Sequence, residues 1–149
     1  MVPSFGMVHA FVFGALMVHR RALEHGEGAV VRDHAVRFVV RGARHEPSFA
    51  SLVEAPGEEA WGVVVPFQTL EWMALRMREA VYRARPVVAR TKSGREVRCH
   101  ALFVFSMMRV DERPPSARYA RLLLRGALHH GLPTHVVDRY RVFAQLTSA

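Results

Sequence analysis

The residue best placed for acid–base chemistry is Glu79, in the run Arg-Glu-Ala-Val-Tyr-Arg at residues 78–83. This run leaves an amphipathic helical segment and enters a stretch of strand-forming residues. A carboxylate held between a core-facing helix and a sheet can be partly buried, and burial raises its pKa toward the range useful for proton transfer. Taken alone, the run fits a solvated surface segment better, because charged side chains are mostly exposed.

A second candidate is the segment Phe-Gly-Ala-Leu-Met at residues 13–17, where an apolar run ends at Gly14 before a short helical stretch. Backbone N–H groups at a strand-to-helix break can face outward and bind an anion such as a carboxylate. An ordinary strand-to-helix turn explains the same five residues. The segment by itself is therefore weak evidence for a site.

Other catalytic signatures are absent from the sequence, which has no GxxxxGK, GxGxxG, GxSxG or HExxH motif. His129, His130 and His135 cluster without a cysteine or carboxylate at ligand spacing. A zinc site needs about three or four convergent ligands. We therefore expect no metal site, and we expect Cys99, in the middle of a strand, to be a buried and inert thiol.

Length and composition favour one cytoplasmic domain. The 149 residues, half of them apolar, are within the usual size range of a single domain, which we expect to span residues 1–149. The longest apolar run, residues 10–18, is too short for a helical membrane span of about 20 residues. It also lacks the preceding Lys or Arg of a signal peptide. The single cysteine fits a reducing compartment, and we expect no membrane association.

The formal net charge of +8 would usually suggest a polyanionic partner. The basic residues are spread along the whole chain, and no stretch interleaves them with aromatic residues as single-stranded nucleic-acid sites do. We therefore expect a solvated basic surface and no specific nucleic-acid partner. Any residual affinity should be non-specific and should collapse with salt.

The strand and turn signals lie mainly in the first two thirds of the chain. Apolar and β-branched runs predict strands at 8–13, 60–65, 87–91 and 95–105, and one or two strands at 29–40. We expect a short helix at 16–23, a polar loop at 42–51 and a hairpin turn at 92–94, Lys-Ser-Gly.

Helical periodicity marks the middle and the end of the chain. In residues 68–77 the spacing i, i+3, i+4, i+7 predicts a helix with Thr69 as N-cap and one core-facing stripe of Leu70, Met73, Ala74 and Met77. Further on, Ser116 and Thr134 are expected to cap two helices at their N-termini, and Gly131 to end the first of them. Strands first and helices last favour a mixed sheet or barrel packed by helices.

Four segments in a fixed order resemble the gamma-glutamylcyclotransferase-like superfamily. They read FVFGALM, WGVVVPF, LRMREAVYRARPVVA and PPSARYARLLLRGALHHGLP, and the resemblance spans residues 8–142. It implies an α+β fold, a small six-stranded mixed β-barrel flanked by helices. It also implies an enzyme (a carbon–nitrogen lyase or acyltransferase) that cyclises a small gamma-glutamyl substrate. The products are 5-oxoproline and a free amine or amino acid, and no metal or organic cofactor is required.

The resemblance also implies roles for particular residues. Glu79 matches the family's acid–base glutamate, and residues 13–17 match the loop that cradles the gamma-glutamyl group. The implied substrate-binding residues are Phe13, Gly14, Ala15, Leu16, Met17, Tyr82 and Tyr119. The leaving amine and the choice between monomer and homodimer stay open.

The sequence also departs from the family pattern. Phe13 replaces the usual tyrosine and Ala15 a serine or threonine, so two hydroxyl groups are missing. Arg76 stands where many members have aspartate, and Ala80 where many have glycine. These departures keep two alternatives open, which are a non-catalytic or divergent small-ligand-binding member of the same fold and a basic nucleic-acid-binding domain.

Overall fold

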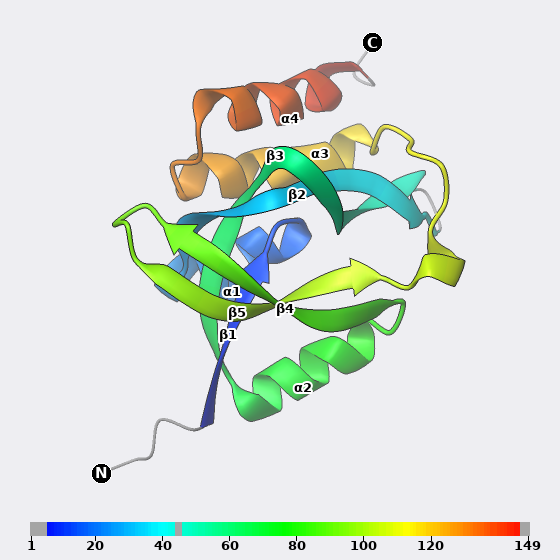
Figure 1. Ribbon diagram of the computed structural model, residues 1–149. Helices are drawn as coiled ribbons and strands as arrows, with labels where there is room; N and C mark the ends of the chain where they lie inside the picture. Colours follow the sequence, from blue (N-terminus) through cyan, green and yellow to red (C-terminus); the bar gives the residue numbers. More distant parts are fainter. Residues whose placement is uncertain (1–5, 44–45, 147–149) are drawn as a thin grey trace.

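The computed structural model describes residues 6–43 and 46–146, which form a closed barrel with flanking helices (Figure 1). The strand order is β1-β3-β2-β4-β5. The strands are β1 (Met7–Val12), β2 (Glu27–Arg41), β3 (Ser48–Gln68), β4 (Tyr82–Thr91) and β5 (Glu96–Val104). β1 and β5 pair in parallel and all other pairs are antiparallel, so the barrel is mixed as expected.

The barrel has five strands, not the six that the resemblance implied, because β2 and β3 are single long strands of 15 and 21 residues. The last four residues of the loop expected at 42–51, residues 48–51, belong to β3. Two polar residues of this segment, Ser48 and Ser51, are completely buried, although their polarity had indicated a loop. The Ser48 hydroxyl donates to the Arg113 carbonyl oxygen at 2.8 Å, and the Ser51 hydroxyl accepts from the Val104 N–H at 3.0 Å. Such bonds satisfy polar groups that a sequence pattern assigns to solvent.

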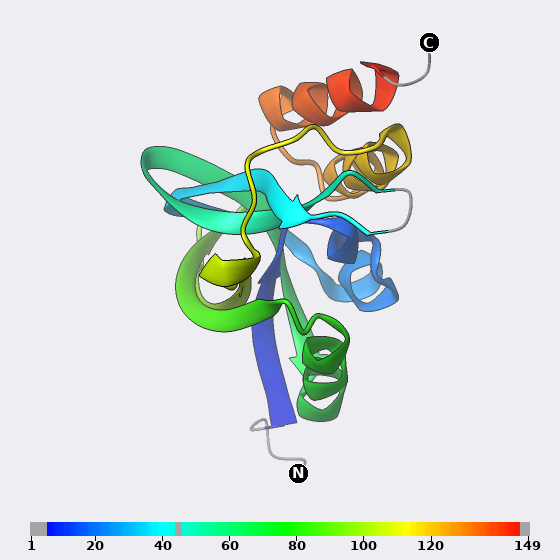
Figure 2. The same ribbon diagram turned by 90° about the vertical axis from the view of Figure 1, so that its right-hand side faces the viewer.

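The helical segments lie outside the barrel. They are the 3₁₀ turn η2 (Ala15–Val18), α1 (Arg20–His25), α2 (Thr69–Arg78), the 3₁₀ turn η3 (Ser106–Met108), α3 (Ala117–His129) and α4 (Thr134–Leu146). α3 lies between α4 and the barrel (Figures 1 and 2), and α2 lies at the opposite end. The helix expected at 16–23 is divided at His19, whose ring nitrogen Nδ1 accepts from the Arg21 N–H. No helix of the described residues is long and apolar enough to cross a membrane.

Several cap and turn predictions are confirmed. Ser116 caps α3, its hydroxyl accepting from the Tyr119 N–H at 3.0 Å. Gly131 follows that helix at φ +62, and Gly94 closes the β4–β5 hairpin at φ +87. The Thr69 cap is wrong, because the Gln68 side chain caps α2 in a capping box with Glu71.

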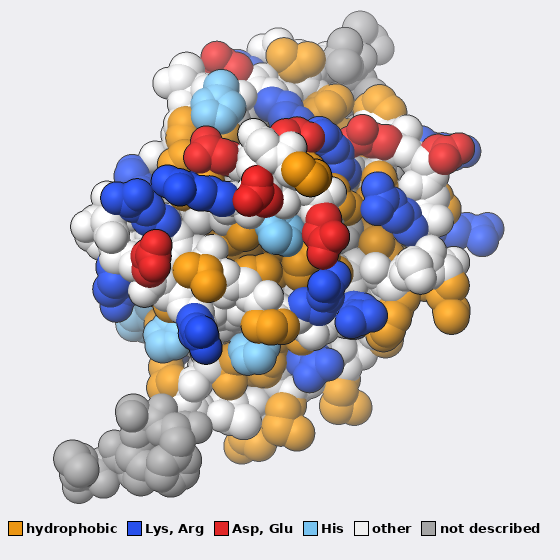
Figure 3. Space-filling view, in the orientation of Figure 1, with side chains coloured by type: hydrophobic (Ala, Val, Ile, Leu, Met, Phe, Trp, Pro, Cys, Tyr) orange, Lys and Arg blue, Asp and Glu red, His pale blue; other side chains and the backbone are white. Residues whose placement is uncertain are grey.

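The buried face of α2 is not the one that the periodicity predicted. Leu70, Met73 and Met77 are 79%, 54% and 81% exposed, whereas Trp72 and Leu75 are buried. Trp72 and Leu75 are three residues apart and form a competing stripe, and the larger indole ring packs into the core. The exposed apolar side chains gather over α2 at the lower edge of Figure 3. On the same face, Lys and Arg are interspersed with Asp and Glu.

The two faces of α2 should differ sharply in their contribution to stability. Leu75→Ala is expected to lower the free energy of unfolding by about 2–5 kcal/mol, because it leaves a cavity in the core. Met73→Ala, on the exposed face, should change it by less than about 0.5 kcal/mol. Urea unfolding of both variants measures the difference. Equal effects, or a larger effect for Met73→Ala, would contradict the placement of the helix.

Candidate functional site

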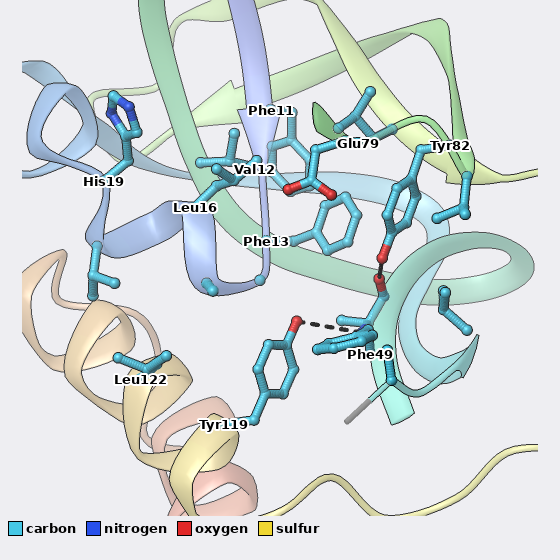
Figure 4. Close-up of a pocket in the computed structure, with 18 of the residues that line it drawn as sticks. Phe11, Val12, Phe13, Leu16, His19, Phe49, Glu79, Tyr82, Tyr119 and Leu122 are labelled. Atoms are coloured by element: carbon cyan, nitrogen blue, oxygen red, sulfur yellow. Dashed lines mark hydrogen bonds between the residues drawn. The ribbon is translucent and has the colours of Figure 1, made fainter. Parts of the chain in front are cut away.

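A cavity of about 610 Å³ opens where β1, η2, the end of α2, β4 and α3 meet (Figure 4). A volume of this size suits a small-molecule ligand. Seven of the eight residues proposed from the sequence line it, namely Phe13, Gly14, Ala15, Leu16, Glu79, Tyr82 and Tyr119. Met17 is the exception, because its side chain is fully buried and is not part of the lining.

Glu79 is positioned by the end of α2. Its N–H donates to the Leu75 carbonyl as the last bond of the helix, and its own carbonyl accepts from the Tyr82 N–H, both at 3.0 Å. This tight turn joins α2 directly to β4 and places Glu79 and Tyr82 on the same cavity. In Figure 4 the Glu79 carboxylate lies beside the Phe13 ring.

The Glu79 carboxyl is half-buried, so the interpretation of residues 78–83 as a fully solvated run does not hold at this position. Burial raises the pKa of Glu79 above its ordinary value of 4.5, and the positive charge of Arg78 opposes the shift more weakly. A carboxyl group with a raised pKa can exchange a proton nearer neutral pH. Glu79 is therefore the candidate proton-transfer group of this cavity.

Tyr82 and Tyr119 both form a hydrogen bond with the backbone of Ala50 in β3 (Figure 4). The Tyr82 hydroxyl donates to the Ala50 carbonyl oxygen at 2.8 Å, and the Ala50 N–H donates to the Tyr119 hydroxyl oxygen at 3.4 Å. Burial raises the pKa of both phenols, and the charge of an ionised Glu79 raises both further. The three side chains therefore interact electrostatically across one site.

Helix α3 holds the loop of residues 13–17 in place through two close contacts. A Cβ on Gly14 would lie 2.9 Å from the Tyr119 hydroxyl oxygen, so only glycine permits this approach without displacement. A Cβ on Gly126 would lie 2.7 Å from the Met17 Cβ. The His130 ring nitrogen Nε2 also donates to the Met17 carbonyl oxygen at 3.0 Å. Met17 thus anchors the loop from behind.

The rest of the cavity wall is mostly apolar, with contributions such as Phe49, Leu102 and Leu122. Two polar residues join it, His19 and Arg41. Burial, with a smaller contribution from Arg78, lowers the pKa of His19, which therefore favours the neutral imidazole. Residues 49 and 50 were missed from the sequence because they fall in the segment expected to be a loop, and no motif marks them.

Two of the three clustered histidines, His129 and His130, form hydrogen bonds to the backbone. His129 bonds to the Leu23 carbonyl oxygen and His130 to that of Met17. Across residues 6–43 and 46–146, no group of three His, Cys, Asp or Glu side chains is arranged to hold a metal ion. Cys99 is buried in β5, and burial raises the pKa of its thiol to about 11.

Comparison with known proteins gives relatives of one kind, although no family model matches the chain. The gamma-glutamylcyclotransferase of Bos taurus is 32% identical over 88 residues, which cover 56% of this chain and 45% of that protein. The gamma-glutamylcyclotransferase of Homo sapiens is 28% identical over 96 residues, covering 62% and 50%. The chain thus spans about half the length of the curated relatives it matches.

Solved structures show the same fold over nearly the whole chain. A gamma-glutamyl cyclotransferase superposes with a TM-score of 0.77 at 21% identity, covering 91% of this chain and 86% of that one. A yeast gamma-glutamyl cyclotransferase specific to glutathione gives a TM-score of 0.70 at 14% identity, covering 95% and 96%. The fold is therefore that of the gamma-glutamylcyclotransferase-like superfamily, and the resemblance seen in the sequence is confirmed.

Proposed function

We propose that this protein is a gamma-glutamylcyclotransferase-type enzyme with Glu79 as its general acid and base. The observation that carries the proposal is the half-buried Glu79 carboxyl, with its raised pKa, in a cavity walled by residues 13–16 and two tyrosines. The superfamily fold and the curated relatives named gamma-glutamylcyclotransferase support the same reaction class.

The reaction is an intramolecular acyl transfer. The α-amine of the gamma-glutamyl group attacks its own gamma-carbonyl carbon, and a bond from nitrogen to carbon closes the five-membered ring of 5-oxoproline. Glu79 accepts the proton that the α-amine loses and returns it to the leaving nitrogen as the old carbon–nitrogen bond breaks. Proton transfer by a positioned side chain contributes roughly 10²–10⁴-fold to the rate. No external proton, electron or nucleophile is consumed.

The cavity walls supply the second contribution, which is orientation. Ring closure requires a folded glutamyl chain with the amine near the gamma-carbonyl, a proximity effect. In this proposal Phe13, Gly14, Ala15 and Leu16 cradle the gamma-glutamyl group on one side, and Tyr82 and Tyr119 on the other. Met17 is revised from a substrate contact to a support for the loop.

The proposal is tested by incubating the protein with gamma-glutamyl-L-alanine, gamma-glutamylbutylamine and glutathione, and by quantifying 5-oxoproline and the released amine. Together these cover an amino-acid, an amine and a peptide leaving group. We expect the two products in equal amounts from at least one substrate. If all three remain intact at high protein concentration, the proposed activity is wrong.

The second candidate is a small-ligand-binding protein of the same fold without turnover. The hydroxyl groups absent at Phe13 and Ala15, both on the cavity, favour it. Calorimetry with gamma-glutamyl-L-alanine separates the two candidates. Tight binding with the ligand recovered unchanged would favour the binding protein, whereas binding followed by 5-oxoproline release favours the enzyme.

A further inference from the structure

The backbone N–H and C=O of Ala50 set the hydrogen-bond direction of both cavity tyrosines. A carbonyl oxygen can only accept a hydrogen bond and a backbone N–H can only donate one. Tyr82 must therefore donate to the Ala50 carbonyl, while Tyr119 must accept from the Ala50 N–H. The two hydroxyl groups consequently offer opposite polarity to any ligand between them.

The hydroxyl proton of Tyr119 is available for a hydrogen bond to a ligand. Its oxygen accepts from the Ala50 N–H at 3.4 Å. A phenol has one O–H, and no acceptor for it is found in residues 6–43 and 46–146. The side chain is only 8% exposed and lines the cavity, so the proton is directed at whatever the cavity holds. A buried donor without a partner in the free protein is costly unless it serves a ligand.

Tyr82 has the opposite arrangement. Its proton is engaged by the Ala50 carbonyl oxygen, so what remains for the cavity is the lone pairs of the hydroxyl oxygen. Such an oxygen accepts from an N–H group. Tyr82 follows Glu79 by one tight turn, so the Tyr82 hydroxyl oxygen and the Glu79 carboxyl belong to the same side of the cavity.

The loop of residues 13–17 cannot supply all the donors that a developing negative charge needs. The Met17 N–H already donates to the Gly14 carbonyl at 3.0 Å and is not available to a ligand. Part of the anion-stabilising role that the sequence suggested for these amides can therefore be taken by the Tyr119 hydroxyl, which lies close against Gly14 of the same loop.

We infer that Tyr119 donates the hydrogen bond that stabilises the gamma-carbonyl oxygen during ring closure, and that Tyr82 accepts an N–H of the attacking α-amine. This inference rests on the proposed function and assigns the two tyrosines distinct roles within it. Both are catalytic residues in the strict sense, because each touches a reacting atom of the substrate.

The sequence of events is then complete in its bonds and protons. As the α-amine nitrogen bonds to the gamma-carbonyl carbon, the carbonyl π-electrons move to oxygen, and the resulting oxyanion accepts the Tyr119 O–H. The amine proton moves to the Glu79 carboxylate. When the carbonyl re-forms, the carbon–nitrogen bond to the leaving group breaks and its nitrogen takes the proton from Glu79. Tyr119 keeps its proton throughout, because burial raises the pKa of its phenol far above neutral pH.

Removing the Tyr119 hydroxyl should therefore lower turnover more than affinity. Tyr119→Phe is expected to reduce kcat for gamma-glutamyl-L-alanine by about 10²-fold, the usual loss for one oxyanion donor, with KM close to wild type. The chain contains three tyrosines, so Tyr140→Phe is a matched control. Tyr140 is almost completely buried and does not line the cavity, and its substitution should leave kcat unchanged.

Removing the Tyr82 hydroxyl should instead weaken recognition of the amine. Tyr82→Phe is expected to raise KM for gamma-glutamyl-L-alanine by about fivefold to tenfold. N-glutaryl-L-alanine, which lacks the α-amine and cannot cyclise, is the diagnostic probe. Its inhibition constant should be the same for wild type and Tyr82→Phe. An equal loss of affinity for both molecules would assign Tyr82 a general structural role and overturn its part of the inference.

The outcomes separate the inference from the function on which it rests. If wild type releases 5-oxoproline and Tyr119→Phe keeps its kcat, the donor assignment is wrong while the enzyme stands. If Tyr119→Phe and Tyr140→Phe lose activity equally, the effect is one of core packing and the assignment again fails. If wild type itself is inactive on every gamma-glutamyl substrate, the proposed function fails first and the assignment with it.

Discussion

Glu79→Gln is expected to abolish most of the 5-oxoproline release, lowering kcat by roughly 10²–10⁴-fold. Glutamine keeps the shape of the side chain and its place at the end of α2, but it can neither accept nor return a proton. The melting temperature should not fall. Turnover of gamma-glutamyl-L-alanine measures the first effect and thermal unfolding the second.

The pH dependence adds a signature to this prediction. The α-amine must lose its proton to an ionised Glu79, so kcat/KM should fall on the acid side. That fall should be centred above 4.5, because burial raises the pKa of this carboxyl above its ordinary value. The acid limb that belongs to Glu79 should be missing from the residual activity of Glu79→Gln.

The raised pKa of Glu79 also affects the pH dependence of stability, in the opposite direction from an ion-paired carboxylate. Because the pKa of Glu79 is raised in the folded state, its favourable contribution is fully present below about 4.5 and is lost as pH rises through the folded pKa. Glutamine is uncharged at every pH. Glu79→Gln should therefore gain stability relative to wild type as the pH rises toward neutrality, as measured by urea unfolding at several pH values.

The matched control for Glu79→Gln is Glu59→Gln, which makes the same change at an exposed position in β3, away from the cavity. It should leave both turnover and its acid limb as in wild type. A Glu79→Gln protein with near wild-type turnover would refute the acid–base assignment, whatever its stability.

Gly14→Ala is expected to lower kcat/KM by about 10²-fold, because a displacement of about 1 Å in a catalytic group can have that effect. The added methyl group would stand 2.9 Å from the Tyr119 hydroxyl oxygen and 3.8 Å from the Ala50 Cβ. One of these neighbours must move, and the Tyr119 hydroxyl is the closer. The backbone itself tolerates alanine, since Gly14 has a negative φ of −113.

The glycine comparison needs a control that adds the same methyl group elsewhere. Gly6→Ala serves, because a Cβ at that position meets no atom of the described residues within 4 Å. Gly6→Ala should leave both the turnover and the melting temperature unchanged. If Gly14→Ala also left turnover unchanged, the close packing of Tyr119 against the loop would not matter for function. The proposal that Tyr119 and the loop act on one substrate would then lose its support.

Much of the barrel could be predicted from the sequence because its strands are dense in β-branched and aromatic residues. The β4–β5 hairpin and the cap at Ser116 follow from local rules, and both are found. The part of β3 that contains Ser48 and Ser51 could not be predicted, because its hydrogen-bond partners are Arg113 and Val104, distant in the sequence. Polarity alone assigned it to a loop.

The orientation of α2 shows a different limit. Leu70, Met73 and Met77 satisfy helical periodicity, yet Trp72 and Leu75 are buried. Periodicity identifies the helix but cannot choose between two apolar stripes when both are present. The choice depends on which stripe fits the rest of the core, here with the Trp72 ring 6.1 Å from that of Phe67.

Some residues of the site could be proposed from the sequence, and others could not. Glu79, residues 13–16 and the two tyrosines could be proposed because ordered motifs resemble a known superfamily, and the structure brings them to one cavity. Ala50 could not be proposed, since its role belongs to its backbone N–H and C=O, which every residue type except proline carries. The hydrogen-bond direction of Tyr82 and Tyr119 depends on these two backbone groups and is visible only in three dimensions.

The central claim is that the gamma-glutamyl group cyclises intramolecularly. The most direct test is to run the reaction of gamma-glutamyl-L-alanine in water enriched in ¹⁸O and to measure the masses of the products by mass spectrometry. Intramolecular cyclisation predicts unlabelled 5-oxoproline and alanine, formed together by wild type and almost absent with Glu79→Gln. Release of alanine together with glutamate carrying ¹⁸O would show that water attacks the gamma-carbonyl. That result would make the protein a hydrolase and contradict the account.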